Sequence, residues 1–332
     1  MAMNLKNNGF GAALNLKPDF LRKKTVGLLS YAARLIVLLS IGFIIIYPLF
    51  YMIVCSVQSA DSFYDSTRVW IPTEFAVKEN YTAAFNAMEY GKSFLSTLKY
   101  AIVSALLEVA SCAFIAYGFA RFNFREKKIY TFFLFITILI PDMILLIPRM
   151  VNFSHLDFLG LFGLFNKLTG VDLRINVLDS PWVFWLPSLF GTGLRSGVII
   201  YIYIQFFKGL PHELEEAAYV DGANHFRTFF SIALPSSCVV ILTATVFSLI
   251  WHWNDYLLSG MYLTKDYPLA MQLNMLTETI MLKYDISVDS SNPQTMAYLM
   301  AGCVLFVTPM LAVYMVLQKG FIESIDRVGI TG

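Results

Sequence analysis

A polar stretch, EEAAYVDGA at residues 215–223, interrupts an otherwise apolar part of the chain. Its acidic residues suit the first turn of a helix, where the backbone dipole is positive. Ala217 and Ala218 are strong helix formers that add almost no bulk, and Gly222 can adopt the left-handed conformation that ends a helix. The stretch therefore predicts a short helix whose small-residue face lets another protein approach closely. The alternative is an ordinary capped helix between two longer ones.

A second candidate is WHWNDY at residues 251–256, which combines aromatic rings with an amide and a carboxylate. Rings stack on the apolar faces of sugars, while amide and carboxylate groups hydrogen-bond to hydroxyls, so this set suits a carbohydrate pathway. The alternative is that the aromatic residues collect at a membrane–water interface because their rings are amphipathic. The candidate pathway residues are Trp251, Trp253, Asn254, Asp255 and Tyr201.

Three ionisable residues fall inside long apolar runs, namely Glu108, Asp142 and Arg195. A charge within a bilayer is costly, so each such residue is a candidate for function. The alternative is that these residues pair with each other or with a partner subunit and fix how the helices pack. We favour this second interpretation.

Other patterns do not support catalysis by this chain. The GKS at residues 91–93 has Asn86 where a phosphate-binding loop needs its first glycine, so nucleotide hydrolysis is expected from another protein. The four histidines do not group, and the four cysteines lie singly in apolar runs, which predicts no metal site and no disulfide framework. We therefore predict a protein that is not an enzyme and holds no cofactor. The formal net charge of +1 gives no basic surface for nucleic acid.

The composition indicates which elements position these residues. The chain of 332 residues is 57% hydrophobic and 14% charged, whereas soluble domains are about 25% charged, so we predict an integral membrane protein. A helix needs about 20 mostly apolar residues to cross a bilayer, and helices satisfy their backbone hydrogen bonds internally. We expect six transmembrane helices, at residues 35–57, 94–118, 130–148, 183–207, 232–256 and 295–317.

The distribution of Lys and Arg predicts the orientation of these helices. Basic residues are concentrated before the first predicted span, after the second, in loop 208–229 and in the C-terminal tail. We therefore expect both termini and loop 208–229 to lie in the cytoplasm. Residues 1–30 are predicted to be a flexible cytoplasmic N-terminus, and residues 31–332 a single transmembrane domain.

The EAAYVDGA stretch, together with IALP at residues 232–235, resembles the cytoplasmic EAA loop of permease subunits in binding-protein-dependent ABC importers. Further similar stretches are AYGFARF at 116–122, QFFKGLP at 205–211 and WNDYL at 253–257. They are similar to the carbohydrate-uptake branch of that family, in the style of its maltose-type second permease. The resemblance covers residues 30–332.

This resemblance implies an all-α fold, the ABC type I importer permease fold, with six transmembrane helices and a cytoplasmic coupling helix in loop 208–229. That helix would sit in a groove on a dimeric ATP-binding cassette ATPase, which holds the ATP and Mg²⁺. Glu216 would offer its carboxylate to a basic group there, and Gly222 would let the chain turn back toward the fifth span. The implied coupling residues are Glu216, Ala217, Ala218, Asp221, Gly222 and Ala223.

The resemblance also implies partners and a location. We expect a heterodimer with a second permease, an extracytoplasmic solute-binding protein, surrounding membrane lipid, and a bacterial cytoplasmic membrane crossed several times. The expected substrate is a carbohydrate, with oligosaccharide as the favoured class. Residues 166–182 are longer than the compact external segment of the family, so external contacts there are not carried over.

Two alternatives remain for the function. One is an ABC permease for a non-sugar solute, and the other is a self-sufficient secondary transporter or channel. The second fits less well, because such proteins usually show more spans, inverted repeats or charged relays.

Overall fold

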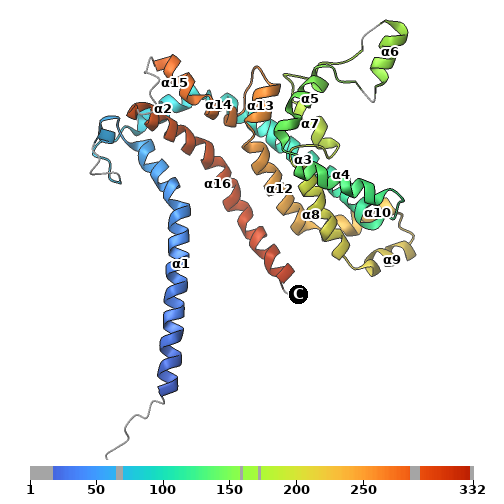
Figure 1. The fold of residues 1–332 in the computed structure, drawn as a ribbon, viewed down its shortest axis with the longest axis horizontal. Helices are drawn as coiled ribbons and strands as arrows, with labels where there is room; N and C mark the ends of the chain where they lie inside the picture. Colours follow the sequence, from blue (N-terminus) through green and yellow to red (C-terminus); the bar gives the residue numbers. More distant parts are fainter. Residues whose placement is uncertain (1–17, 65–69, 158–159, 171–172, 285–291, 330–332) are drawn as a thin grey trace, which may run out of the picture. The chain divides into compact units, whose positions relative to one another are not determined.

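The computed structural model describes residues 18–64, 70–157, 160–170, 173–284 and 292–329 (Figure 1). The contacts of the chain divide it into two units, Met1–Val54 and Cys55–Gly332, which are described separately. The described residues form helices, and their only strand-like pairings are isolated bridges from Gln58 to Phe75 and from Leu156 to Ile175.

The first unit consists mainly of helix α1 (Pro18–Val57), which contains the first predicted span. From Val26 onward this helix is apolar and long enough to cross a membrane, and its side chains there are mostly exposed. Exposed apolar area of this extent is unfavourable in water, so the helix requires lipid or protein around it. Of the predicted flexible N-terminus, residues 1–17 lie outside the described residues, and the chain is helical from Pro18.

The second unit continues through helices of very different lengths. Their bounds are η1 (Asp61–Tyr64), α2 (Val77–Ala87), α3 (Tyr90–Arg121), α4 (Lys127–Leu139), α5 (Asp142–Ser154), α6 (Leu161–Thr169), α7 (Trp182–Leu189), α8 (Ser196–Gly209), α9 (His212–Val220), α10 (His225–Thr228), η2 (Phe229–Ala233), α11 (Leu234–Ser236), α12 (Cys238–Trp253), α13 (Leu257–Tyr262), α14 (Leu269–Asn274), α15 (Leu276–Tyr284) and α16 (Pro293–Gly329).

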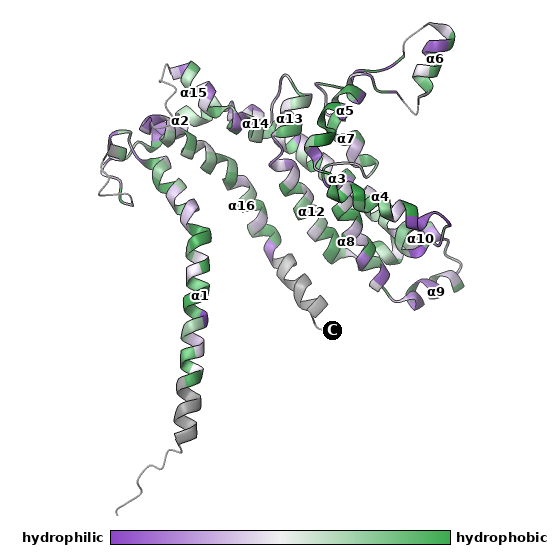
Figure 2. Ribbon diagram, in the orientation of Figure 1, coloured by the Kyte–Doolittle hydropathy of each residue, from purple (hydrophilic) through white to green (hydrophobic). Residues whose placement is uncertain are grey.

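Helix α3 is the centre of the second unit and packs against α7, α8 and α12. Its buried face is rich in small side chains, including Ala105, Cys112, Ala113 and Ala116. Small residues let membrane helices approach closely, where dispersion contacts replace the hydrophobic effect as the source of association. Figure 2 shows apolar residues along α8 and α12 and hydrophilic residues in α9.

Among the described residues, α1, α3 and α16 are each long and apolar enough to cross a membrane as single helices. Two bent pairs qualify if each pair is counted as one span: α4 with α5, and α10–α11 with α12. These elements coincide with five of the six predicted spans. The fourth predicted span, 183–207, is instead divided into α7 and α8 by residues 190–195.

The third predicted span is not a continuous helix, because α4 and α5 meet at an angle of 104°. Pro141 lies at the break, and it has no N–H to continue the helical hydrogen bonds. The residue before a proline is driven toward extended conformations, and Ile140 has φ −72° and ψ 122°. One proline therefore changes the direction of the chain.

The breaks in the fourth and fifth predicted spans also have local causes. In the fifth, α10–α11 and α12 meet at 77°, just after Pro235 removes a backbone donor. In the fourth, Gly191 and Arg195 have φ +65° and +59°, which no helix accommodates. A Cβ on Gly193 would lie 2.9 Å from a carboxylate oxygen of Glu108, so this loop packs directly against α3.

Candidate functional site

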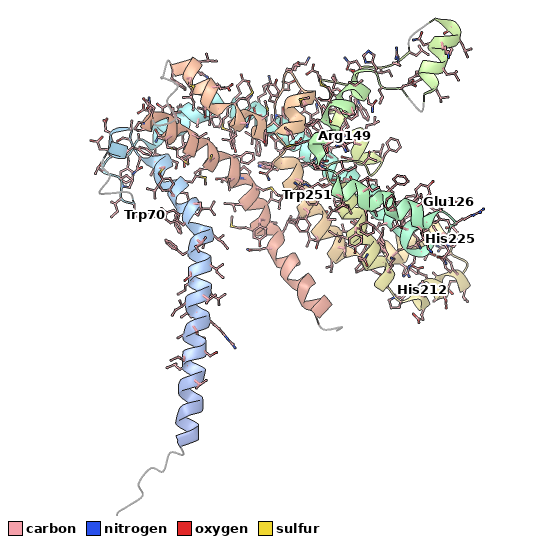
Figure 3. The ribbon with its side chains drawn as sticks, in the orientation of Figure 1. Trp70, Glu126, Arg149, His212, His225 and Trp251 are labelled. Atoms are coloured by element: carbon pink, nitrogen blue, oxygen red, sulfur yellow. The ribbon has the colours of Figure 1, made fainter. Side chains whose placement is uncertain are left out.

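The polar stretch at residues 215–223 forms most of α9 and the turn that follows it, and Figure 3 labels His212 at the start of this helix. Gly222 has φ +79°, the left-handed conformation predicted for it. The N–H of Ala223 donates to the carbonyl of Ala218 at 2.9 Å. This arrangement ends a helix and turns the chain, so the local geometry of the stretch is as the sequence predicts.

A buried ion pair ties the inner face of α9 to the end of α3. Nε of Arg121 lies 2.8 Å from Oε1 of Glu215, and the two side chains are 4% and 7% exposed. These two atoms are too poorly aligned for a hydrogen bond, so the contact is electrostatic. Nη2 of Arg121 donates to the carbonyl of Leu210 at 2.9 Å, and Nη1 lies 3.2 Å from Nε2 of His212. One guanidinium therefore fixes both the entry to α9 and its first turns.

The outer face of α9 differs from the predicted face of paired alanines. Successive helical residues point about 100° apart, so Ala217 is exposed while Ala218 is buried on the same side as Glu215. Of the predicted coupling residues, those exposed are Glu216, Ala217, Asp221 and Gly222, with Ala223 partly exposed.

An apolar side chain completes this outer face. Val220 follows Glu216 by four residues, which places the two side chains on one side of the helix, and Val220 is 88% exposed. The outer face of α9 thus presents a carboxylate and an apolar side chain to its surroundings.

A cavity of about 990 Å³ lies between α4, α8 and the end of α12. Trp251, Asn254 and Asp255, three of the five predicted pathway residues, line it together with Arg149; Figure 3 labels Trp251 and Arg149. Ligand pockets of roughly 300–1,000 Å³ hold drug-sized molecules, so this volume suits an oligosaccharide segment.

The other two predicted pathway residues do not line this cavity. Trp253 is 5% exposed, and its indole N–H donates to the carbonyl of Phe306 at 3.3 Å. Tyr201 packs against Phe135, with ring centroids 5.5 Å apart. Trp251 and Trp253 are two residues apart on a helix and therefore point to different sides, which the sequence prediction did not take into account.

The ionisable residues inside the predicted spans do pair, but not with each other. Asp142 lies 3.7 Å from Arg149. Arg195 lies over the ring of Trp251, with its guanidinium carbon 5.3 Å from the ring centroid. The sequence prediction singled out Asp142 and Arg195 but missed these partners.

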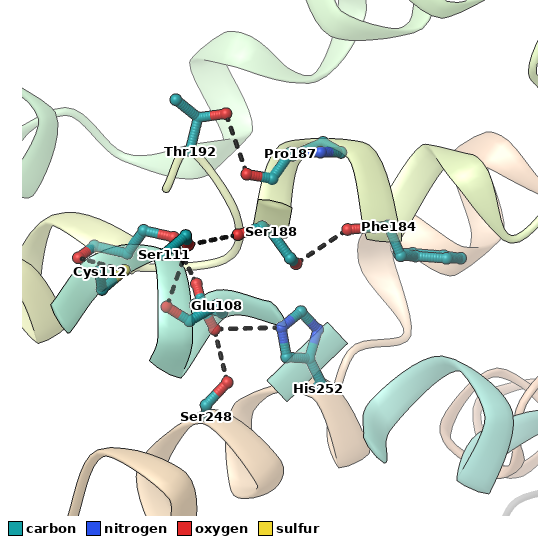
Figure 4. A network of polar contacts seen from close by, with 10 residues as sticks. Glu108, Ser111, Cys112, Phe184, Pro187, Ser188, Thr192, Ser248 and His252 are labelled. Carbon is teal, nitrogen blue, oxygen red and sulfur yellow. Dashed lines mark hydrogen bonds and ion pairs between the residues drawn. The ribbon is translucent and has the colours of Figure 1, made fainter. Parts of the chain in front are cut away.

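Glu108 lies at the centre of a polar network that joins α3, α12 and the start of α8 (Figure 4). Its side chain is fully buried. It accepts hydrogen bonds from the hydroxyl of Ser196 and, at 2.5 Å, from that of Ser248. Nε2 of His252 lies 3.2 Å from Oε2, the same oxygen that accepts from Ser248, while Ser196 donates to Oε1. These contacts satisfy a carboxylate that would otherwise be costly to bury.

The GKS sequence at residues 91–93 lies at the start of a helix. Ser93 of the GKS sequence lies in the first turn of α3, and its hydroxyl donates to the carbonyl of Met88 at 2.9 Å. That hydroxyl is engaged within the start of a helix, and Asn86 stands where a phosphate-binding loop needs its first glycine. Within the described ranges, no group of three or more His, Cys, Asp or Glu residues is arranged to hold a metal ion.

Comparisons with known proteins agree on one family. Residues 111–327 match the family described as "Binding-protein-dependent transport system inner membrane component". The chain is 25% identical to the diacetylchitobiose uptake system permease protein NgcG of Streptomyces coelicolor, over 86% of this chain and 83% of the relative. It is 26% identical to the polygalacturonan/rhamnogalacturonan transport system permease protein YtcP of Bacillus subtilis, over 86% and 93%.

One solved structure is similar over nearly the whole chain. It is the crystal structure of a bacterial ABC transporter involved in the import of the acidic polysaccharide alginate, with a TM-score of 0.63 and 17% sequence identity. The match covers 94% of this chain and 99% of that chain. At this level of identity the similarity concerns the fold.

Proposed function

Because the chain belongs to the family of binding-protein-dependent transport system inner membrane components, we propose that it forms, with a second permease, the pathway of a bacterial carbohydrate importer. The predicted all-α membrane fold and the permease function are confirmed by the family match and the similar structure. The chain is a transporter component. A dimeric ATPase that binds ATP and Mg²⁺ would supply the energy, and an extracytoplasmic protein would deliver the solute.

The geometry of α9 carries the coupling part of this proposal. Its inner face is fastened to α3 through Arg121 and Glu215, while Glu216 and Val220 face outward. A movement applied to the outer face is therefore passed to α3, the central helix of the unit. This is what a coupling helix requires when two ATPase subunits close and drive a rigid-body transition. Both termini and α9 would lie on the cytoplasmic side.

The cavity supports a carbohydrate as the solute. Trp251 offers an aromatic ring, and Asn254 and Asp255 offer polar groups beside it, the combination that sugar rings and hydroxyls require. The names of the relatives also refer to saccharides. An oligosaccharide is the class we favour, and a non-sugar solute is the alternative.

The coupling role is tested by replacing Glu216 with Ala in the assembled importer and measuring ATP hydrolysis and solute uptake in proteoliposomes. We expect uptake to fall at least tenfold, because a charge-assisted contact to the ATPase is worth roughly 1.5–3 kcal/mol. Glu213→Ala is the matched control, since Glu213 is also an exposed acid of α9 and should leave uptake unchanged. Normal uptake in Glu216→Ala would remove the assignment.

The alternative of a self-sufficient transporter is tested with the purified chain alone. We expect no uptake by the chain alone and ATP-dependent uptake once the second permease, the ATPase and the binding protein are added. A membrane-impermeant thiol reagent should label Glu213→Cys only when it is applied from the ATPase side. Uptake by the chain alone, or labelling from the opposite side, would contradict the proposed function.

A further inference from the structure

The cavity contains a cation, Arg195, that forms an ion pair with no carboxylate among the described residues. The charged side chains that line it are Asp142, Arg149, Arg195 and Asp255. Asp142 and Arg149 lie 3.7 Å apart, so their charges offset each other. Asp255 accepts the N–H of Leu258 at 3.0 Å and is thereby directed toward α13. Within the described part of the chain, Arg195 forms no salt bridge.

The guanidinium of Arg195 is held in one orientation by an aromatic partner. It lies 5.3 Å from the ring centroid of Trp251, and Trp251 in turn stacks on Phe247, with centroids 5.6 Å apart and planes at 14°. A guanidinium held by an aromatic ring keeps its N–H donors, and their fork matches the two oxygens of a carboxylate.

The backbone that carries Arg195 is also fixed. Arg195 precedes α8 with φ +59° and ψ 23°, a backbone conformation that residues other than glycine rarely adopt. The neighbouring Ser196 is hydrogen-bonded to the buried Glu108, and Gly193 packs tightly against the same carboxylate. Strained conformations persist where the surrounding structure determines them, and they concentrate at functional sites.

We propose that Arg195 and Trp251 form a subsite for the carboxylate-bearing ring of an acidic oligosaccharide. This inference rests on the proposed permease function and makes its substrate class more specific. The guanidinium would bind the carboxylate through two charge-assisted hydrogen bonds, and Trp251, which stacks on Phe247, would hold the guanidinium in place for them. A neutral sugar offers only hydroxyls there, so it would gain neither the charge nor the two-point geometry.

The test measures binding to the assembled importer in nanodiscs without its binding protein, so that selectivity of the binding protein does not contribute. The probes are trigalacturonate and the carboxyl-reduced trisaccharide with the same linkages. We expect trigalacturonate to bind more tightly, and Arg195→Gln to weaken its binding about tenfold or more with little effect on the neutral probe. Arg195→Lys keeps the charge but not the fork, so it should lose part of the affinity.

Lys99→Gln is the matched control, because Lys99 lies 5.8 Å from the ring centroid of Tyr100 and does not line the cavity. It should leave the affinity for trigalacturonate unchanged. Equal binding of both probes by the wild-type complex, no binding of trigalacturonate, or an equal loss for both probes in Arg195→Gln would each overturn the subsite.

Two further measurements identify what has failed. If the complex does not distinguish the two probes but takes up a neutral saccharide in an ATP-dependent way, the subsite is contradicted and the permease function stands. Absence of ATP-dependent uptake of any saccharide would contradict the proposed function itself. Nanodiscs with and without anionic lipid separate the other source of a negative group: if anionic lipid abolishes the preference for trigalacturonate in the wild type and leaves the residual binding by Arg195→Gln unchanged, Arg195 binds a lipid headgroup and the sugar subsite is wrong.

Discussion

Two buried glutamates, Glu215 in α9 and Glu108 in α3, are held by different kinds of partner. Glu215 faces the guanidinium of Arg121, which is charged at all physiological pH values. Glu108 faces two serine hydroxyls and the imidazole of His252. The first contact joins a peripheral helix to the bundle, and the second joins three elements of the bundle to each other.

The difference in partners corresponds to a difference in mechanical role. Serine hydroxyls are short, so the Glu108 network requires its helices to stay in close contact. The side chain of Arg121 is long and also reaches Leu210 and His212, so it holds α9 by several points at a distance from α3. We infer that the Glu108 network keeps the bundle rigid, while Arg121 passes the movement of α9 to it.

The largest effect is expected from Arg121→Ala. The change leaves the buried carboxylate of Glu215 without its cation, a loss of roughly 3 kcal/mol for a buried pair, and it frees the entry to α9. ATP hydrolysis by the assembled importer should continue while solute uptake falls at least tenfold. Both rates are measured in the same proteoliposomes.

A double variant sharpens this prediction. Arg121→Met with Glu215→Leu removes both charges and keeps apolar packing, so it should restore folding without restoring full coupling. If Arg121→Ala transports normally, the contact between α3 and α9 is not the route by which movement is passed.

A smaller effect, on stability rather than coupling, is expected from Glu108→Ala. It leaves the hydroxyls of Ser196 and Ser248 without their acceptor, and each buried group left unsatisfied costs roughly 1–3 kcal/mol. The thermal unfolding midpoint of the purified complex should fall, while the ratio of uptake to ATP hydrolysis at low temperature stays unchanged. Glu108→Gln keeps one carbonyl acceptor and should lose less. An altered ratio in either variant would contradict the division of roles between the two glutamates.

Gly222→Ala should act locally on the turn after α9. A Cβ there meets no atom within 4 Å, so only the backbone strain at φ +79° opposes the change, about 1–2 kcal/mol for an L-residue. We expect a partial loss of coupling and a smaller fall in the unfolding midpoint than in Glu108→Ala. Gly209→Ala is the control, because Gly209 also has open space without a positive φ, and it should leave both quantities unchanged.

The sequence predicts features that depend on neighbouring residues. The helix α9 and its left-handed Gly222 follow from acidic, alanine and glycine residues within a few positions. Glu108 stands out because carboxylates are rare in apolar spans. Its partners Ser196, Ser248 and His252 lie 88, 140 and 144 residues away, so no local pattern could identify them.

Other differences come from reading apolar runs as continuous helices. The run over 183–207 has the length of a span, but Gly191 and Arg195 adopt positive φ in a loop that packs against α3 through Ile115 and Glu108. Composition does not distinguish such a loop from a helix. Whether Glu215 or Glu216 points inward likewise depends on the tertiary contact between Glu215 and Arg121. The position of the two residues in the sequence does not decide it.

The smallest effect is expected from replacing a third carboxylate, Asp266, which lies at the surface, unlike Glu108 and Glu215. Its pair with Lys92 is 2.9 Å long, and the side chains of Lys92 and Asp266 are 61% and 49% exposed. The hydrogen bond and charge of Lys92 hold the pKa of Asp266 below its usual value. Because the folded pKa is the lower one, the contribution is present above the unfolded pKa, about 3.9, and is lost as pH falls through the folded pKa.

Solvent and salt screen such a pair, so Asp266→Asn at pH 7 should lower the unfolding midpoint far less than Glu108→Ala, and the difference should vanish in about 1 M NaCl. A drop as large as that of Glu108→Ala would mean that burial is not what separates these carboxylates.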